Sequence, residues 1–226
     1  MQRASVRRLV NLSSLTVYGE DGLDWKEQDE IKLGSANPYI RAQQMNEQIL
    51  SDVYHVDHYW QILNLRLGNV IGAHPQGLLG EWTPQLPNSA LPTLLQVAAG
   101  QRDFFEIYHQ DLNTSDGTSV RNYVHVMDVV EAVYDLMTWS NQQQNLFEHF
   151  NVTQSEPSSL KELIKKIEQV CLSKITIEPS QIPSPEIASL SASNEKLKST
   201  INWLPKYSIE DMIKHQWDYY QNSLKK

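Results

Sequence analysis

Apolar positions along the chain follow two periods, one typical of strands and one typical of helices. Apolar runs at residues 6–12 and 60–67 predict strands. Between them, Asn37 and Pro38 indicate the start of a helix that extends to about residue 53. The apolar residues of this helix fall near a 3.6-residue period: Ile40, Met45, Ile49, Leu50 and Val53. The amino-terminal part therefore reads as strand, helix, strand.

The same alternation continues to the end of the chain. We expect further strands at residues 104–108, 120–126, 149–153 and 174–179. We expect further helices at residues 91–99, 128–139, 160–171 and 209–220. Residues 68–88 are rich in glycine and proline and fit neither period, so they predict a long loop of the kind that often carries function. Alternating strands and helices predict an α/β fold with a largely parallel sheet.

Composition and charge narrow the class of partner. With 40% hydrophobic and 20% charged residues, the 226-residue chain is expected to be globular, with one core or with one domain and a smaller appended region. Its net charge of −8 argues against nucleic acid, because phosphates require clustered basic residues. No apolar stretch is long enough to span a membrane, and residues 1–10 lack the apolar core of a signal peptide. We expect no nucleic-acid or membrane partner and a cytoplasmic location, which suits the single cysteine, Cys171.

The glycines do not form a nucleotide-binding fingerprint. A dinucleotide-binding fold begins with a strand, a G-x-G-x-x-G turn and a helix whose amino terminus holds the pyrophosphate. No such turn occurs in this sequence. Four of the nine glycines lie in the predicted long loop with the spacing of turns: Gly68, Gly72, Gly77 and Gly80. We therefore expect that the chain alone does not retain a dinucleotide.

Five motifs occur in a fixed order along the chain. They are SSLTVYGE, NPYIRAQ, LRLGNVIGAHPQGLLGE, VAAGQRD and DGTSVRNYVHVMD. Together they resemble the UDP-glucose 4-epimerases of the extended short-chain dehydrogenase superfamily, over nearly the whole chain but without that family's amino-terminal half. The resemblance implies an incomplete doubly wound, Rossmann-like parallel sheet with a smaller carboxy-terminal substrate-binding region. Residues 1–70 then correspond to the end of the NAD-binding domain and residues 71–226 mostly to the nucleotide-sugar region, with residues 120–153 returning to the sheet.

The resemblance also implies a chemistry. The family interconverts UDP-glucose and UDP-galactose with NAD through a 4-keto intermediate. A tyrosine removes the 4-hydroxyl proton, a serine relays it, and a lysine lowers the pKa of the tyrosine and bonds the nicotinamide ribose. Tyr39 fills the tyrosine position and Ser14, 25 residues earlier, the serine position. Gln43 stands in place of the lysine, so we expect Tyr39, Ser14 and Gln43 to face the cofactor in an impaired site.

The substrate side implied by the resemblance is only partly kept. The expected substrate-binding residues are Asn69, Asn88, Ser89, Tyr108 and Arg121. Arg121 matches an arginine expected to grip the diphosphate. Ser89 stands in place of an asparagine, and Leu67 and Gly68 in place of two aromatic residues. The segment SQIPS at residues 180–184 has lost the charge of the matching family segment.

Read without the resemblance, these residues have simpler roles. Ser14 is a strand-end turn residue and Tyr39 a residue at a helix start. His55 and His58 lack a third ligand, and residues 111–117 lack the terminal acid of a calcium loop, so no metal is expected.

Three functions remain open. The first is an epimerase that is active when the chain is complete. The second is a non-catalytic module that binds a UDP-sugar, forms a homodimer or pairs with a full-length epimerase. The third is a product without activity.

Overall fold

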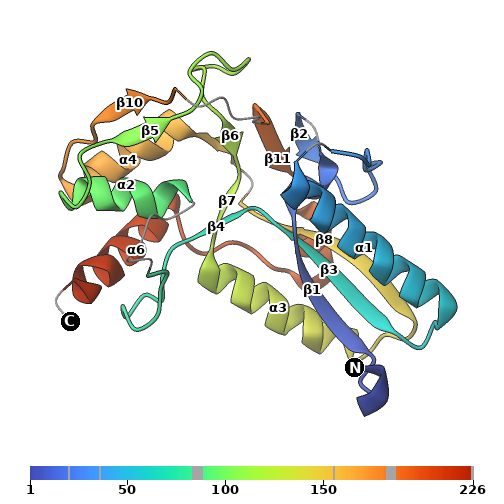
Figure 1. Ribbon diagram of the computed structural model, residues 1–226. Helices are drawn as coiled ribbons and strands as arrows, with labels where there is room; N and C mark the ends of the chain where they lie inside the picture. Colours follow the sequence, from blue (N-terminus) through green and yellow to red (C-terminus); the bar gives the residue numbers. More distant parts are fainter. Residues whose placement is uncertain (20, 36, 83–88, 155, 182–186, 225–226) are drawn as a thin grey trace.

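A three-stranded parallel sheet forms the base of the fold (Figure 1). Its strands are β1 (Arg8–Ser14), β3 (Gln61–Leu67) and β8 (Leu146–Val152), with β3 in the middle. The computed structural model describes the chain except for residues 20, 36, 83–88, 155, 182–186 and 225–226. Ser14 lies opposite Leu67, and Leu67 lies opposite Val152, so the three strands end level with one another. Any group carried at these ends is therefore presented at one edge of the sheet.

Helices cover both faces of this sheet. Helix α1 (Pro38–Val56) is capped by Asn37, whose side chain accepts a hydrogen bond from the amide of Tyr39. Pro38 occupies the first turn, where its missing N–H costs nothing. On the opposite face, α3 (Val126–Ser140) and α5 (Glu195–Ile201) bury apolar side chains against Leu63 and Leu65 of β3. Since side chains alternate along a strand, Asn64 and Arg66 of β3 point toward α1.

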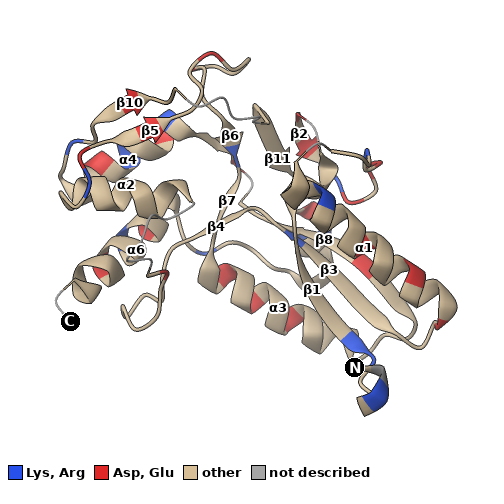
Figure 2. Ribbon diagram, viewed as in Figure 1, with Lys and Arg blue, Asp and Glu red and all other residues tan. Residues whose placement is uncertain are grey.

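A second core lies beyond the carboxyl edge of the sheet. It is enclosed by α2 (Ala90–Ala98), α4 (Leu160–Cys171) and α6 (Ile209–Ser223), and by the paired strands β5 (Phe105–Ile107) and β10 (Ile177–Pro179). Capping boxes start α4 at Ser159 and α6 at Ser208. Figure 2 shows acidic and basic residues on several of these elements, whereas the charged positions of α3 are acidic.

Short strands connect the two cores. Strand β4 (Asn69–Ile71) pairs in parallel with β7 (Tyr123–His125). A four-stranded sheet has the order β2 (Gly22–Trp25), β11 (Ser189–Ala192), β6 (Val120–Arg121) and β9 (Ser158–Ser159). The 3₁₀ turns η1 (Gln2–Ala4) and η2 (Leu15–Tyr18) precede and follow β1.

The elements agree with the predicted α/β alternation in most places. The predicted loop at residues 68–88 is wrong at residues 69–71, which form β4, because three residues are too few to reveal a period. Strands β2 and β11 and helix α5 were not predicted, for the same reason of length. The division of the chain at residue 70 stays a prediction. Within the described ranges no helix is long and apolar enough to cross a membrane.

Candidate active site

Ser14 ends β1 and starts the turn η2. Its backbone is extended, and its Oγ accepts hydrogen bonds from the amide of Thr16 at 3.2 Å and from the Thr16 hydroxyl at 3.0 Å. Serine is favoured at such a cap because its short side chain reaches the free amides of the turn. With two bonds accepted, the hydroxyl hydrogen of Ser14 is still available for donation.

Tyr39 is the second residue of α1. Its amide donates to Asn37 Oδ1 at 2.9 Å, and its side chain is 56% exposed. Helix α1 packs against both η2 and β1, so the turn that carries Tyr39 and the strand end that carries Ser14 belong to elements in contact. The structure thus places the two predicted catalytic residues on packed elements, with Ser14 at the end of β1 and Tyr39 in the first turn of α1.

Gln43 lies one helical turn after Tyr39. It is half-buried, and its side-chain Oε1 is shielded from solvent without a hydrogen-bond partner in the described part of the chain. A buried amide oxygen without a partner is costly, and such groups often mark a place where a ligand bonds. A carboxamide is able to bond a ribose hydroxyl, but it carries no positive charge.

A buried polar network lies beneath these residues, between α1 and the sheet. The carboxylate of Glu47 receives the guanidinium of Arg66, with Nη2 at 2.8 Å and Nε at 3.1 Å, and the hydroxyl of Ser13 at 2.6 Å. Arg66 also donates to the Tyr18 hydroxyl at 3.2 Å, which donates to Asn151 Oδ1 at 2.8 Å. Desolvation raises the pKa of Tyr18, so its hydroxyl stays protonated.

His149 borders the same network. Its Nδ1 lies 3.3 Å from Nη2 of Arg66 and 3.4 Å from the carboxylate of Glu47. Burial, with the neighbouring guanidinium, lowers the pKa of His149 to about 4. At neutral pH the ring is therefore uncharged, and Glu47 balances Arg66 alone.

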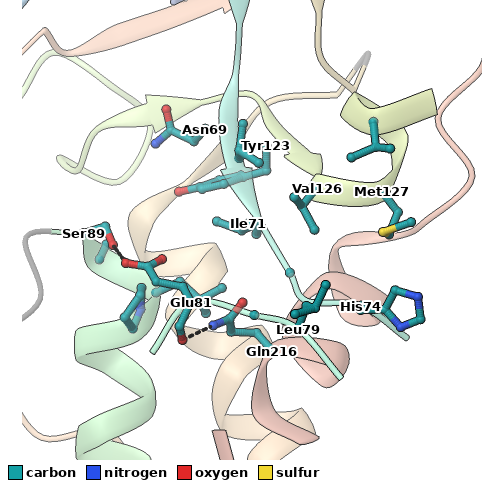
Figure 3. A pocket seen from close by; sticks show the side chains of 17 residues that line it. Asn69, Ile71, His74, Leu79, Glu81, Ser89, Tyr123, Val126, Met127 and Gln216 are labelled. Carbon is teal, nitrogen blue, oxygen red and sulfur yellow. Dashed lines mark hydrogen bonds between the residues drawn. The ribbon is translucent and has the colours of Figure 1, made fainter. Parts of the chain in front are cut away.

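A cavity of about 590 Å³ opens beside β4 and β7 (Figure 3). Two predicted substrate-binding residues line it: Asn69 begins β4, and Ser89 precedes α2. Most of the remaining wall is apolar, with Ile71, Val126 and Met127 labelled in Figure 3. Large, mostly apolar cavities with a few polar groups are typical of small-molecule sites.

The polar end of the cavity is built around Glu81. The side chain of Gln216, from α6, donates to the backbone oxygen of Glu81 at 3.1 Å, and Ser89 Oγ lies 3.5 Å from its carboxylate (Figure 3). Asn69 lies at the opposite end, beyond the ring of Tyr123. Glu81, Tyr123 and Gln216 were not among the predicted site residues.

A histidine pair lies behind the cavity. Nδ1 of His125 accepts the amide of Met127 at 2.9 Å, so the ring proton is on Nε2, which donates to Nδ1 of His215 at 3.0 Å. The His125 ring stacks on Tyr207 with centroids 4.1 Å apart. Burial, and then His215, lowers the pKa of His125 to about 4. The pair is therefore neutral at physiological pH.

Gly68 marks the crossing from the sheet to the cavity. Its amide donates to the Val152 oxygen at 3.0 Å, and the next amide, of Asn69, donates to the Asn122 oxygen at 2.8 Å. A Cβ atom at Gly68 would lie 2.9 Å from both the Asn122 oxygen and Oγ1 of Thr153. The backbone here is packed for glycine, at a position where the sequence departs from the motif it resembles.

The other predicted substrate residues lie elsewhere. Arg121, in β6, donates to the backbone oxygens of Val120 at 2.8 Å and of Ile187 at 2.5 Å, which ties it to the segment before β11. Tyr108 follows β5 and is largely exposed. Neither lines the cavity. Asn88 and most of the SQIPS segment lie outside the described residues. No metal-binding group of three or more His, Cys, Asp or Glu side chains is found in the described part of the chain.

Comparison with known proteins assigns this chain to a family. The model of the NAD dependent epimerase/dehydratase family matches residues 1–153. A UDP-glucose 4-epimerase of Cyamopsis tetragonoloba is 34% identical, over 94% of this chain and 61% of that protein. One from Neisseria meningitidis serogroup C is 33% identical, over 99% of this chain and 66% of that protein. The chain thus spans about three fifths to two thirds of the length of these relatives.

Comparison with solved structures supports the same family. The UDP-glucose 4-epimerase of Bifidobacterium longum, in complex with NAD⁺ and UDP, superimposes with a TM-score of 0.93 at 30% identity. The alignment covers 99% of this chain and 66% of that structure. The expected Rossmann-like α/β fold is confirmed. The chain belongs to the NAD dependent epimerase/dehydratase family.

Proposed function

We propose that the chain binds a UDP-sugar, in the manner of a UDP-glucose 4-epimerase, and presents Tyr39 and Ser14 to the hydroxyl at C4 of that sugar. The observation that carries this proposal is the level ending of the sheet strands. Ser14 pairs with Leu67, and Asn69 follows only two residues later, so Ser14 and the cavity share one sheet edge. Ligands of parallel α/β sheets bind at this edge.

Ser14 and Tyr39 have distinct parts in the proposed site. Both bonds that Ser14 Oγ accepts come from Thr16, which fixes its lone pairs and leaves its hydrogen to donate to the sugar hydroxyl or to Tyr39. Tyr39 is exposed enough to reach a ligand, and its helix start is fixed by the Asn37 cap. In this arrangement Tyr39 takes the hydroxyl proton as the general base, and Ser14 positions the sugar oxygen by donating a hydrogen bond to it.

The residues present fit only one part of NAD. Gln43, with its unpartnered amide oxygen, is suited to the nicotinamide ribose together with Tyr39 and Ser14. NAD, when bound, supplies the hydride acceptor. The 226 residues contain no glycine-rich turn for its pyrophosphate. We therefore propose that the chain alone holds NAD weakly and is impaired or inactive as an epimerase.

The sugar nucleotide is proposed to lie across residues 71–226, with Asn69 at the boundary. Asn69 and Ser89 offer an amide and a hydroxyl at the cavity, and Tyr108, Asn88 and Arg121 are proposed along the nucleotide. Because the Arg121 guanidinium already donates to backbone oxygens, its proposed part is to hold β6 against β11 as well as to contact the diphosphate.

A second candidate is a non-catalytic module that binds a UDP-sugar or a partner. Gln43 favours it, because a neutral side chain cannot supply the positive charge that activates the tyrosine in the family. Helix α1 favours it too, since Met45, Ile49 and Val56 are exposed at heptad-like spacing on one side. We propose that this stripe joins two copies of the chain, or one copy and a full-length epimerase.

Calorimetric titration separates these candidates. We expect UDP-glucose and UDP-galactose to bind, and Asn69→Ala to weaken binding. Lys165→Ala is the matched control, because Lys165 of α4 is exposed and does not line the cavity. A coupled assay with added NAD then measures turnover against Tyr39→Phe. Turnover abolished by Tyr39→Phe supports the catalytic candidate, and binding without turnover supports the module. Absence of UDP-glucose binding to the folded chain refutes the catalytic candidate and the UDP-sugar-binding module, and leaves only the partner-binding module.

A further inference from the structure

Glu47 connects the helix of the proposed site to both strands beneath it. It is 5% exposed, and Arg66 of β3, its ion-pair partner, is 2% exposed. The same carboxylate accepts the hydroxyl of Ser13, the neighbour of Ser14 on β1. One side chain of α1 is thus bonded to the ends of two strands.

The spacing along α1 relates this contact to the site. Tyr39, Gln43 and Glu47 are each four residues apart, so they form one row along the helix. Glu47 is the inner end of this row and Tyr39 the outer end. Because the helix between them is continuous, any shift of Glu47 along or around the helix axis is passed on to Tyr39.

We propose that Glu47 is a positioning residue for the proton-handling pair. By holding Ser13 and Arg66 together, it sets the register of α1 on β1 and thereby the placement of Tyr39 relative to Ser14. This inference rests on the proposed function of that pair. The ionic contact serves geometry more than stability.

The physical chemistry of buried ion pairs supports this assignment. Taking two charges out of water costs about as much as their attraction returns, so apolar residues of similar volume often replace such a pair without loss of stability. What the apolar replacement loses is direction. A bidentate guanidinium–carboxylate contact fixes one register, whereas apolar surfaces slide past one another at little cost.

The experiment measures the register directly. Nitroxide labels at Leu12→Cys on β1 and Ala42→Cys on α1, both exposed positions, report the helix–strand distance in a Cys171→Ala background. A control pair at Leu12→Cys and Tyr134→Cys reports the placement of α3, which does not contact Glu47. Pulsed electron paramagnetic resonance gives the width of each distance distribution, and thermal unfolding is followed on the unlabelled chain.

Three variants test the proposal. In Glu47→Met with Arg66→Met we expect the β1–α1 distribution to broaden about twofold, the control distribution to stay as it is, and the melting temperature to be unchanged. Ser13→Ala should broaden it less, and Ser13→Thr, which keeps the hydroxyl, should restore the width. An unchanged β1–α1 width in the double variant overturns the proposal. A lower melting temperature with both distributions broadened also overturns it, since the pair is then a general stabiliser.

These outcomes are independent of the proposed function, because the distances are measured without ligand or turnover. Calorimetry with UDP-glucose on the same unlabelled variants tests that function separately. A chain that fails to bind UDP-glucose but shows the expected broadening refutes the proposed site and leaves the role of Glu47 standing. The reverse result refutes the role of Glu47 alone.

Discussion

Acidification to pH 5 should destabilise the protein through His125. This side chain is fully buried, its Nδ1 caps α3, and its Nε2 donates to His215. A proton can enter only by breaking the bond to the Met127 amide, since the other ring nitrogen already carries hydrogen. The groups around it are His215 and Asp211 of α6 and the ring of Tyr207, and only Asp211 favours the charged form.

The magnitude follows from the two pKa values. The pKa of His125 is about 4 in the folded protein, against 6.5 in the unfolded chain. As the pH falls, the unfolded chain binds the proton first, so the stabilisation present above pH 6.5 is lost progressively down to pH 4. Between pH 7 and pH 5 this linkage removes about 2 kcal/mol from the free energy of unfolding.

Urea denaturation at pH 7 and pH 5 measures the loss. His149 titrates in the same direction, so the contribution of His125 is isolated by comparison with His125→Asn. Asparagine is a favourable N-cap and keeps an acceptor for the Met127 amide, but it does not titrate. We expect His125→Asn to lose about 2 kcal/mol less than the parent between the two pH values. Equal losses in both proteins would refute the assignment of the buried, neutral His125–His215 pair.

Two other predictions concern the proposed site, and a third concerns the exposed apolar stripe of α1. Gly68→Ala should lower the free energy of unfolding by about 1–3 kcal/mol, because the added Cβ crowds Asn122 and Thr153, and it should weaken UDP-glucose binding in calorimetry. The double variant Gly68→Ala with Thr153→Ala should lose less stability. An unchanged free energy of unfolding in Gly68→Ala contradicts the close packing at Gly68. Gln43→Lys alone should not produce epimerase turnover in the coupled assay, because the chain lacks a pyrophosphate turn, and turnover above a Tyr39→Phe background would sink this view. Met45→Lys with Ile49→Glu should lower the mass seen by light scattering; an unchanged mass argues against the α1 interface.

Much of the fold was predictable because its long elements carry a clear period. Helix α1 was expected to about residue 53 and ends at Val56, and β3 was expected over residues 60–67 and spans Gln61–Leu67. Five consecutive buried residues make β3 read as an apolar run, even though two of them, Asn64 and Arg66, are polar. Parallel strands buried on both faces produce this signal.

The parts that were not predicted depend on contacts between distant segments. Strand β4 exists because Asn69–Ile71 meets Tyr123–His125, and three residues have no period of their own. Strand β11 likewise exists by pairing with β2 and β6. Short strands are stabilised by their neighbours rather than by their own propensity, so local sequence contains little information about them.

The residues of the candidate site also differ in whether the sequence alone could predict them. Ser14 and Tyr39 were predicted from motifs and stay a prediction, whereas the contact of α1 with β1 and η2 follows from the topology that those motifs imply. Glu81 and Gln216 were not identified, because Gln216 belongs to the last helix and meets Glu81 only through folding. Their contact joins segments 135 residues apart, a distance over which a single sequence provides no pairing signal.

The neutral Gln43 and the charged Glu47 show why two neighbouring positions on one side of α1 differ in how much stability a substitution costs. The two residues are adjacent in one row of α1, but they meet different physical demands. Removing Glu47 leaves the Arg66 guanidinium buried without its carboxylate, a change that costs about 3–5 kcal/mol, a large part of the stability of a typical domain. Glutamine at position 43 leaves one amide oxygen without a partner in the described part of the chain, which costs about 1–3 kcal/mol. We therefore expect a substitution at position 43 to cost less stability than a substitution at position 47.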